Sequence, residues 1–104
     1  MKQLTANDSL DDLLLEHEHS LLFFSASWCG PCQSMTPVVE NVSNAMNQRL
    51  NTIKVDVDAS QHDAIDYGIR SVPTLLLVKN NEIIAQQVGG MPPVQLMQWL
   101  EQYI

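Results

Sequence analysis

The stretch SLLFFSASWCGPC, residues 20–32, joins an apolar run to the only two cysteines of the chain. Residues 20–26 are a continuous apolar run of strand length, which predicts a strand buried on both faces. Cys29 and Cys32 follow directly, and the sequence predicts a helix over about residues 29–48. The cysteine pair is therefore expected at the point where a buried strand gives way to a helix.

The rest of the chain continues this alternation of strands and helices. We expect further helices at 7–17, 60–68 and 92–104 and further strands at 51–57, 74–79 and 82–88. The complete order is β-α-β-α-β-α-β-β-α, although the pattern gives no bounds for the first strand. This order predicts an α/β fold, a mixed sheet with helices on both faces. In such sheets the reactive groups gather beyond the carboxyl ends of the strands, where the cysteine pair is expected.

Local signals predict how these elements begin and end. Asn7 or Asp8 is expected to cap the first helix, and Gly68 is expected to close the short one. Asn80 and Asn81, between two strands, predict a two-residue hairpin. The expected buried positions of the last helix are Val94, Met97, Leu100 and Ile104.

Length and composition limit the possible functions. The chain has 104 residues, 45% of them hydrophobic and 16% charged, so we expect a single domain over residues 1–104. Five basic and twelve acidic residues give a net charge of −7, which argues against binding to nucleic acid or to an anionic membrane. No segment has the pattern of a signal peptide or of a membrane span. We therefore expect a cytoplasmic monomer.

The spacing of the cysteines indicates their chemistry. Cysteines at positions i and i+3 of a first helical turn lie close enough to form a disulfide. The helix N-terminus favours thiolate over thiol. We therefore expect Cys29, the nearer of the two to that end, to attack a substrate disulfide and Cys32 to resolve the mixed disulfide. A zinc site is disfavoured, because none of the three histidines has zinc-finger spacing from the pair. An inert structural disulfide is also disfavoured, because so short a loop gains little stability.

The segment WCGPC, residues 28–32, resembles the active-site motif of the thioredoxin family. The resemblance extends over essentially the whole chain. The matching positions are Pro37 for the proline that kinks the helix, Lys54 for the lysine beneath the active site, Pro73 for the cis-proline and Gly89 for the glycine of the substrate groove. The resemblance implies the thioredoxin fold, in which four helices flank a central mixed five-stranded sheet.

The same resemblance implies a function. Thioredoxins reduce protein disulfides, donate electrons to reductive enzymes and maintain the redox state of the cell. Their electrons come from NADPH through thioredoxin reductase, and the redox-active disulfide serves in place of any bound cofactor or metal. The resemblance therefore implies thioredoxin reductase and disulfide-containing client proteins as partners.

Residues around the cysteine pair are expected to bind the client. The candidates for an apolar patch that holds extended peptide are Trp28, Pro31, Val72 and Met91. Plain core packing is the alternative for Val72 and Met91. Because Pro73 cannot donate to a strand ladder, its neighbours are left to pair with a client backbone. The full set of expected substrate-binding and supporting residues is Trp28, Gly30, Pro31, Val72, Pro73, Gly89 and Lys54.

Two positions depart from the family's pattern. Phe23 stands where thioredoxins usually carry a buried aspartate, and Gln33 stands where they mostly carry Lys or Arg. The aspartate is thought to act as general base for the resolving cysteine, so we expect in this chain either a slower resolving step or a water molecule that relays the proton. Without that carboxylate, Lys54 is expected to extend outward or to pair with Asp56 or Asp58.

Two other functions stay open at this point. The dithiol also suits an oxidant or an isomerase, although the Gly-Pro pair between the cysteines favours a reductase by resemblance. A thioredoxin fold also serves as a binding or chaperone-like adaptor, which would use the groove around Trp28 and Pro73. Replacing both cysteines by serine separates the classes, because binding should survive that change and redox activity should not.

Overall fold

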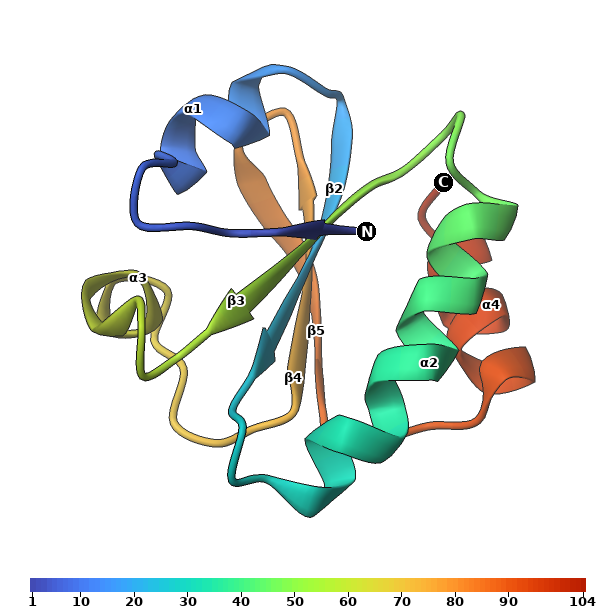
Figure 1. Cartoon of the computed structure of the whole chain (residues 1–104). Helices are drawn as coiled ribbons and strands as arrows, with labels where there is room; N and C mark the ends of the chain where they lie inside the picture. The colour runs from blue at the N-terminus through green and yellow to red at the C-terminus, as the bar shows by residue number, and fades with distance from the viewer.

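The computed structural model describes residues 1–104 as five strands and four helices, in the order that the sequence predicts (Figure 1). The strands are β1 (Lys2–Gln3), β2 (His19–Ser25), β3 (Asn51–Asp56), β4 (Thr74–Lys79) and β5 (Glu82–Val88), and the helices are α1 (Leu10–Leu15), α2 (Gly30–Ala45), α3 (Gln61–Asp66) and α4 (Pro93–Glu101). They form one sheet in the order β1-β3-β2-β4-β5. Strands β1, β3 and β2 run parallel, whereas β4 is antiparallel to both β2 and β5. The predicted mixed five-stranded sheet with four helices is confirmed.

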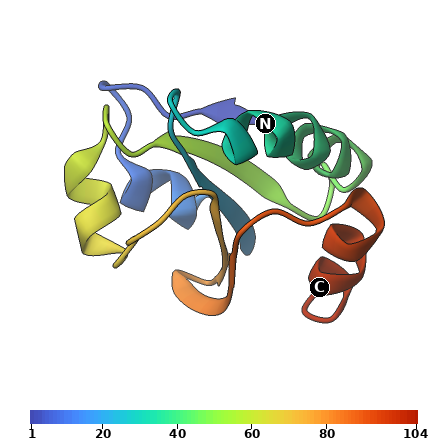
Figure 2. The same ribbon diagram turned by 90° about the horizontal axis from the view of Figure 1, so that it is seen from below.

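The central strand β2 joins two hydrophobic cores. Because its side chains alternate between the faces of the sheet, Leu21 and Phe23 belong to one core cluster, and Leu22 and Phe24 belong to the other. Figures 1 and 2 show α2 and α4 on one side of the sheet and α1 and α3 on the other. All four β2 side chains are fully buried, as expected for a strand that is covered on both faces.

Helix α1 begins later than its predicted start. Its N-cap is Ser9, whose Oγ accepts a 3.3 Å hydrogen bond from the backbone N–H of Asp12. The prediction of Asn7 or Asp8 is wrong, because the Asp8 carboxylate instead accepts a 2.9 Å hydrogen bond from the backbone N–H of Thr5. That bond closes the turn before the helix.

The two long helices also differ in detail from their predictions. Helix α2 ends at Ala45, and turns occupy residues 46–49, so it is shorter than the predicted 29–48. On α4 the prediction that Val94 is buried is wrong, since that side chain is 69% exposed. The residues of α4 that are fully buried against α2 and the sheet are Leu96 and Leu100.

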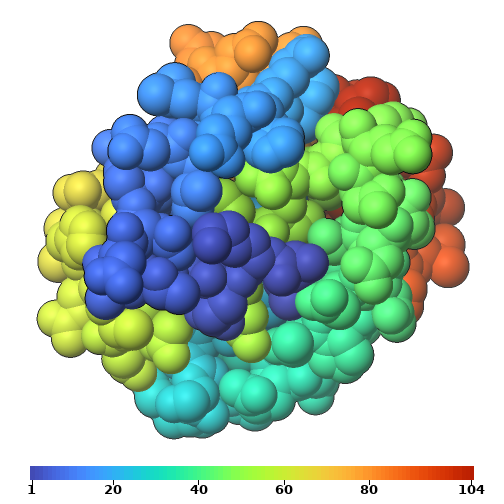
Figure 3. Space-filling model, turned by 45° about the horizontal axis from the view of Figure 1, so that its top comes forward, coloured from blue at the N-terminus to red at the C-terminus, as the bar shows by residue number.

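The predicted turns are confirmed. Gly68 follows α3 with φ of 70°, and the hairpin residues Asn80 and Asn81 have φ values of 49° and 71°. Glycine and asparagine tolerate this left-handed conformation better than other residues. Figure 3 shows the β4–β5 hairpin, in orange, and the start of α2, in teal, at opposite ends of the molecule. No helix combines the length and apolar character needed to cross a membrane.

Candidate active site

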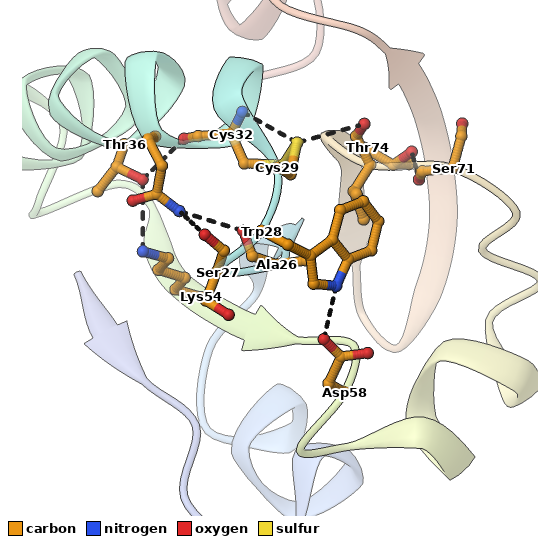
Figure 4. The surroundings of a disulfide bond; sticks show 12 residues. Ala26, Ser27, Trp28, Cys29, Cys32, Thr36, Lys54, Asp58, Ser71 and Thr74 are labelled. Carbon is orange, nitrogen blue, oxygen red and sulfur yellow. Dashed lines mark hydrogen bonds between the residues drawn. A yellow bond between two sulfur atoms is a disulfide. The ribbon is translucent and has the colours of Figure 1, made fainter.

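A disulfide joins Cys29 to Cys32 at the start of α2, with the two Cα atoms 5.2 Å apart (Figure 4). Cys29 is the N-cap residue, and its Sγ accepts a 3.2 Å hydrogen bond from the backbone N–H of Cys32. This donor and the positive end of the helix dipole stabilise negative charge on the sulfur once the disulfide is reduced. Cys29 is 6% exposed and Cys32 is 0% exposed, so Cys29 is the cysteine that a substrate disulfide can reach.

The loop that precedes β4 passes beside this disulfide. The peptide bond between Val72 and Pro73 is cis, and the carbonyl oxygen of Val72 lies 3.7 Å from Sγ of Cys29. The backbone N–H of Gly89 donates a 2.9 Å hydrogen bond to the carbonyl oxygen of Pro73. Gly89 has φ of 91°, which suits glycine and few other residues. Three segments that are distant in the sequence therefore meet at one end of the sheet.

Trp28 covers a small apolar cavity next to Val72. The ring is 69% exposed, and its Nε1 donates a 2.7 Å hydrogen bond to Oδ2 of Asp58. The cavity has a volume of about 150 Å³, which is below the size of pockets that hold a whole small-molecule ligand.

 The cavity beside Trp28 therefore suits a single amino-acid side chain rather than a separate small molecule. The residues that line it are Trp28, Val57, Ala64, Ile69, Arg70, Ser71 and Val72.

Two residues of the expected apolar patch do not line this cavity. Pro31 is exposed in the first turn of α2 and does not line the cavity beside Trp28. Met91 is partly buried, packs against the core under α2 and α4, and lines a different cavity with Trp99. The cavity therefore extends from Trp28 and Val72 toward the loop after α3, and its lining includes neither Pro31 nor Met91.

Comparison with known proteins assigns this fold and disulfide to a family. The thioredoxin family model matches residues 1–102. The chain belongs to the thioredoxin family. It is 40% identical to the thioredoxin of Haemophilus influenzae over 84 residues, which are 81% of this chain and 78% of that protein. It is 30% identical to the thioredoxin of Rhodospirillum rubrum over 101 residues, 97% of each protein.

Solved structures of thioredoxins have the same fold. A mutant thioredoxin from Halobacterium salinarum has a TM-score of 0.88 and 35% identity, over 98% of this chain and 88% of that one. The thioredoxin of Plasmodium falciparum has a TM-score of 0.91 and 30% identity, over the full length of both chains. With the Cys29–Cys32 disulfide, this membership identifies a thiol-disulfide oxidoreductase that reduces protein disulfides. Thioredoxins carry no prosthetic group, so the disulfide itself is the redox-active unit.

Lys54 lies beneath the active site of this thioredoxin-family chain, next to Phe23. The two residues are paired in register between β3 and β2, and Nζ of Lys54 lies 5.9 Å from the centroid of the Phe23 ring. Nζ also donates a 3.3 Å hydrogen bond to Oγ1 of Thr36 on α2. Lys54 therefore has a hydroxyl and an aromatic ring as its partners.

Of the two alternatives expected for Lys54, the pairing with Asp56 or Asp58 is wrong. The ion pairs of the chain do not include Lys54. Oδ1 of Asp56 accepts a 2.8 Å hydrogen bond from the backbone N–H of Asp58, and the Asp58 carboxylate accepts the indole N–H of Trp28. Both carboxylates therefore already have donors at the end of β3.

Gln33 and Thr36 make contacts in the site that the sequence does not predict. In the sequence Gln33 is only a departure from the family's pattern, and Thr36 is not among the expected site residues. Nε2 of Gln33 donates a 3.1 Å hydrogen bond to the carbonyl oxygen of Ala26 and lies 3.5 Å from that of Ser27. Gln33 thus ties α2 to the loop that follows β2, a contact that its position after Cys32 did not indicate. Thr36 is one helical turn beyond Cys32, and that spacing is the only sequence signal for it.

Proposed function

We propose that the chain reduces client disulfides in two balanced exchange steps. In the first, the Cys29 thiolate attacks one client sulfur, forms a mixed disulfide with it and releases the other client sulfur as a thiolate. In the second, the Cys32 thiolate attacks Sγ of Cys29, closes the Cys29–Cys32 disulfide and releases the remaining client sulfur as a thiolate. The client gains two electrons, the protein loses two, and the released thiolates take protons from water.

The different environments of the two sulfurs support these roles. Cys29 is the more exposed of the two cysteines and its Sγ accepts the N–H of Cys32, so a thiolate there is both stabilised and the more accessible one. Cys32 is fully buried, one helical turn further into α2. A buried thiol that lies next to Cys29 suits the intramolecular step, because proximity replaces encounter with a second molecule.

The loop beside Cys29 supports binding of an extended client segment. Val72 lies between α3 and β4, outside the regular elements, and its backbone makes no hydrogen bond to other backbone groups of the chain. Its N–H and carbonyl therefore have no backbone partner and can pair with a client backbone in the manner of an added strand. The cavity beside Trp28 would then receive a client side chain.

We further propose that thioredoxin reductase returns electrons from NADPH to the disulfide, with the chain acting as a monomer. Family membership supports this electron source, and the disulfide in the structure is the oxidised form that would accept the electrons. A reducing compartment such as the cytoplasm suits a protein that has to be kept as a dithiol. Reduction by purified thioredoxin reductase and NADPH, followed by thiol titration, tests this electron source directly.

The two cysteine roles are tested with insulin as the client and dithiothreitol as the electron donor, so that no reductase is needed. Wild-type protein should accelerate insulin reduction, and Cys29→Ser should abolish the acceleration. Cys32→Ser, reduced and then freed of dithiothreitol before insulin is added, should accumulate a covalent insulin adduct that mass spectrometry detects. Full activity of Cys29→Ser, or wild-type turnover of Cys32→Ser, would overturn the assignment.

The reduction potential of the pair distinguishes a reductase from an oxidant or isomerase. A potential below the cytosolic glutathione poise supports electron donation to clients, and a potential above it supports the opposite direction. The variant with both cysteines replaced by serine tests the adaptor alternative. Binding of unfolded insulin chains by that variant at wild-type affinity would support an adaptor role besides the redox role.

A further inference from the structure

Cys32 lies in surroundings that disfavour the thiolate needed for the resolving step. Its side chain is fully buried in a cluster with Ala26 and Cys29, against which Val57 and Val72 pack. Burial among apolar groups favours the neutral thiol over the charged thiolate. A positive charge held near this turn of α2 would offset that penalty.

One cation is held against the turn of α2 that begins at Cys32. The hydroxyl of Thr36 donates a 2.9 Å hydrogen bond to the carbonyl oxygen of Cys32, and the same hydroxyl oxygen accepts a 3.3 Å hydrogen bond from Nζ of Lys54. Figure 4 shows Lys54 reaching from β3 toward Thr36 on the helix. The face of the Phe23 ring provides a second attractive contact for the ammonium.

No carboxylate forms an ion pair with this ammonium, since Lys54 takes part in none of the ion pairs of the chain. Asp56 on β3 accepts backbone N–H groups of the following loop, and Asp58 in that loop accepts an indole N–H. On α2, Glu40 lies 3.6 Å from the N-terminal amine of Met1. The acidic groups nearest in β3, its following loop and α2 therefore have other partners.

A polar cavity of about 210 Å³ gives solvent access to this region. Its wall includes Gln3, Ser25, Ala26, Gln33, Lys54 and Asp56, of which only Lys54 and Asp56 are charged. The cavity has room for several water molecules and enough polar groups to bind them. Ala26 belongs both to this wall and to the cluster around Cys32, so the cavity that would supply a water to take the Cys32 proton lies next to that cluster.

We propose that Thr36 is a positioning residue that holds the Lys54 ammonium where it stabilises the Cys32 thiolate in the resolving step. The proposal rests on the proposed reductase mechanism and explains how the buried thiol ionises when Phe23 leaves no carboxylate beneath it. During resolution the proton of Cys32 passes to water, and the thiolate then attacks Sγ of Cys29. Lys54 acts by its charge and keeps its protons throughout.

The experiment follows the two exchange steps separately, with reduced protein and the chromogenic disulfide 5,5′-dithiobis(2-nitrobenzoic acid). The first equivalent of nitrothiobenzoate reports attack by Cys29, and the second reports resolution by Cys32. Thr36→Val removes the hydroxyl at nearly constant volume, and Thr36→Ser keeps it as the matched control. In Thr36→Val the pH midpoint of the second phase should rise, and its rate at neutral pH should fall about tenfold, as expected when one nearby opposite charge is lost.

Further variants make the test independent of folding defects in one protein. Lys54→Met should shift the second phase in the same direction as Thr36→Val, and the double variant should add little, because both remove one interaction. Thr36→Ser should behave like the wild type. An unchanged midpoint in both Thr36→Val and Lys54→Met, each shown to be folded by thermal unfolding, overturns the proposal. Absence of a second phase in the wild type would instead overturn the reductase mechanism itself.

Discussion

Nε1 of Trp28 donates a 2.7 Å hydrogen bond to Oδ2 of Asp58, which links the active-site loop to the loop after β3. Because the Trp28 side chain is 69% exposed, packing alone does not fix its ring. The hydrogen bond to a carboxylate therefore determines how the ring lies over the cavity next to Val72.

Asp58→Ala is expected to free the ring of Trp28 and to lower kcat/KM for insulin reduction by roughly fivefold, since one such hydrogen bond contributes about 1 kcal/mol. Asp58→Asn keeps an acceptor oxygen and should lie close to the wild type. Insulin reduction assays and the NMR resonance of the indole N–H measure the two effects. An indole resonance that stays at its wild-type position in Asp58→Ala would contradict the prediction.

Phe23→Asp should both destabilise the fold and accelerate resolution of the mixed disulfide. Phe23 is fully buried in the core under α2 and α4, so replacing it with a carboxylate should lower the free energy of unfolding by about 3–5 kcal/mol. The new carboxylate also provides a proton acceptor for Cys32. Urea unfolding measures the first effect, and the second phase of the chromogenic assay measures the other.

Phe23→Leu is the control for this change, because it loses the ring but keeps an apolar side chain. It should cost less stability than Phe23→Asp and should not accelerate resolution. If Phe23→Asp unfolds more readily but resolves at the wild-type rate, the carboxylate has no catalytic effect in this chain.

Tyr67 makes the free energy of unfolding depend on pH in the alkaline range. Burial, and next the Asp11 carboxylate that accepts its hydroxyl at 3.2 Å, raise the pKa of Tyr67 from 10.0 to about 12. The folded state thus favours the neutral phenol, so its contribution is complete below pH 10 and is lost as the pH rises toward 12. Tyr67→Phe should reduce the fall in urea-unfolding stability over this range, whereas Tyr103→Phe should not. Equal pH profiles for the two variants would contradict this.

Gly68→Ala should destabilise the fold through its backbone conformation. The φ of 70° costs a residue with a Cβ about 1 kcal/mol, although a Cβ at this position would have no atom within 4 Å. Gly68→Asn should cost less, because asparagine tolerates the left-handed region. Thermal unfolding measures both, and a Tm for Gly68→Ala equal to that of the wild type would show that the turn relaxes.

Local patterns predict most of the fold, and tertiary contacts account for the differences. The apolar run of β2 and the Asn80–Asn81 hairpin are decided by neighbouring residues, and both are confirmed. Strand β1 has only two residues and exists because Lys2 pairs with Ile53, which no local pattern reveals. Val94 was expected to be buried because it is apolar, but the way α4 packs against α2 buries Leu96 instead.

The features of the active site are likewise of two kinds, those that the sequence predicts and those that depend on tertiary packing. The spacing of Cys29 and Cys32 indicates their pairing, because both lie on one helical turn. The partner of Lys54 could not be predicted, because it depends on how β3 and α2 pack together and brings Lys54 to Thr36. Resemblance to the family supplied the position of Pro73, whose contact with Gly89 joins residues that are distant in the sequence.

Cys29 is both the N-cap residue of α2 and one of the two cysteines that are oxidised and reduced. As a thiolate, Sγ of Cys29 is a charged acceptor for the N–H of Cys32, and in the disulfide it is a neutral and weaker one. Reduction therefore tightens the first turn of the helix, and by reciprocity a tighter helix start favours the reduced form. A ligand or substitution that stabilises this turn will therefore raise the midpoint potential, and one that destabilises the turn will lower it, without contact to a sulfur atom.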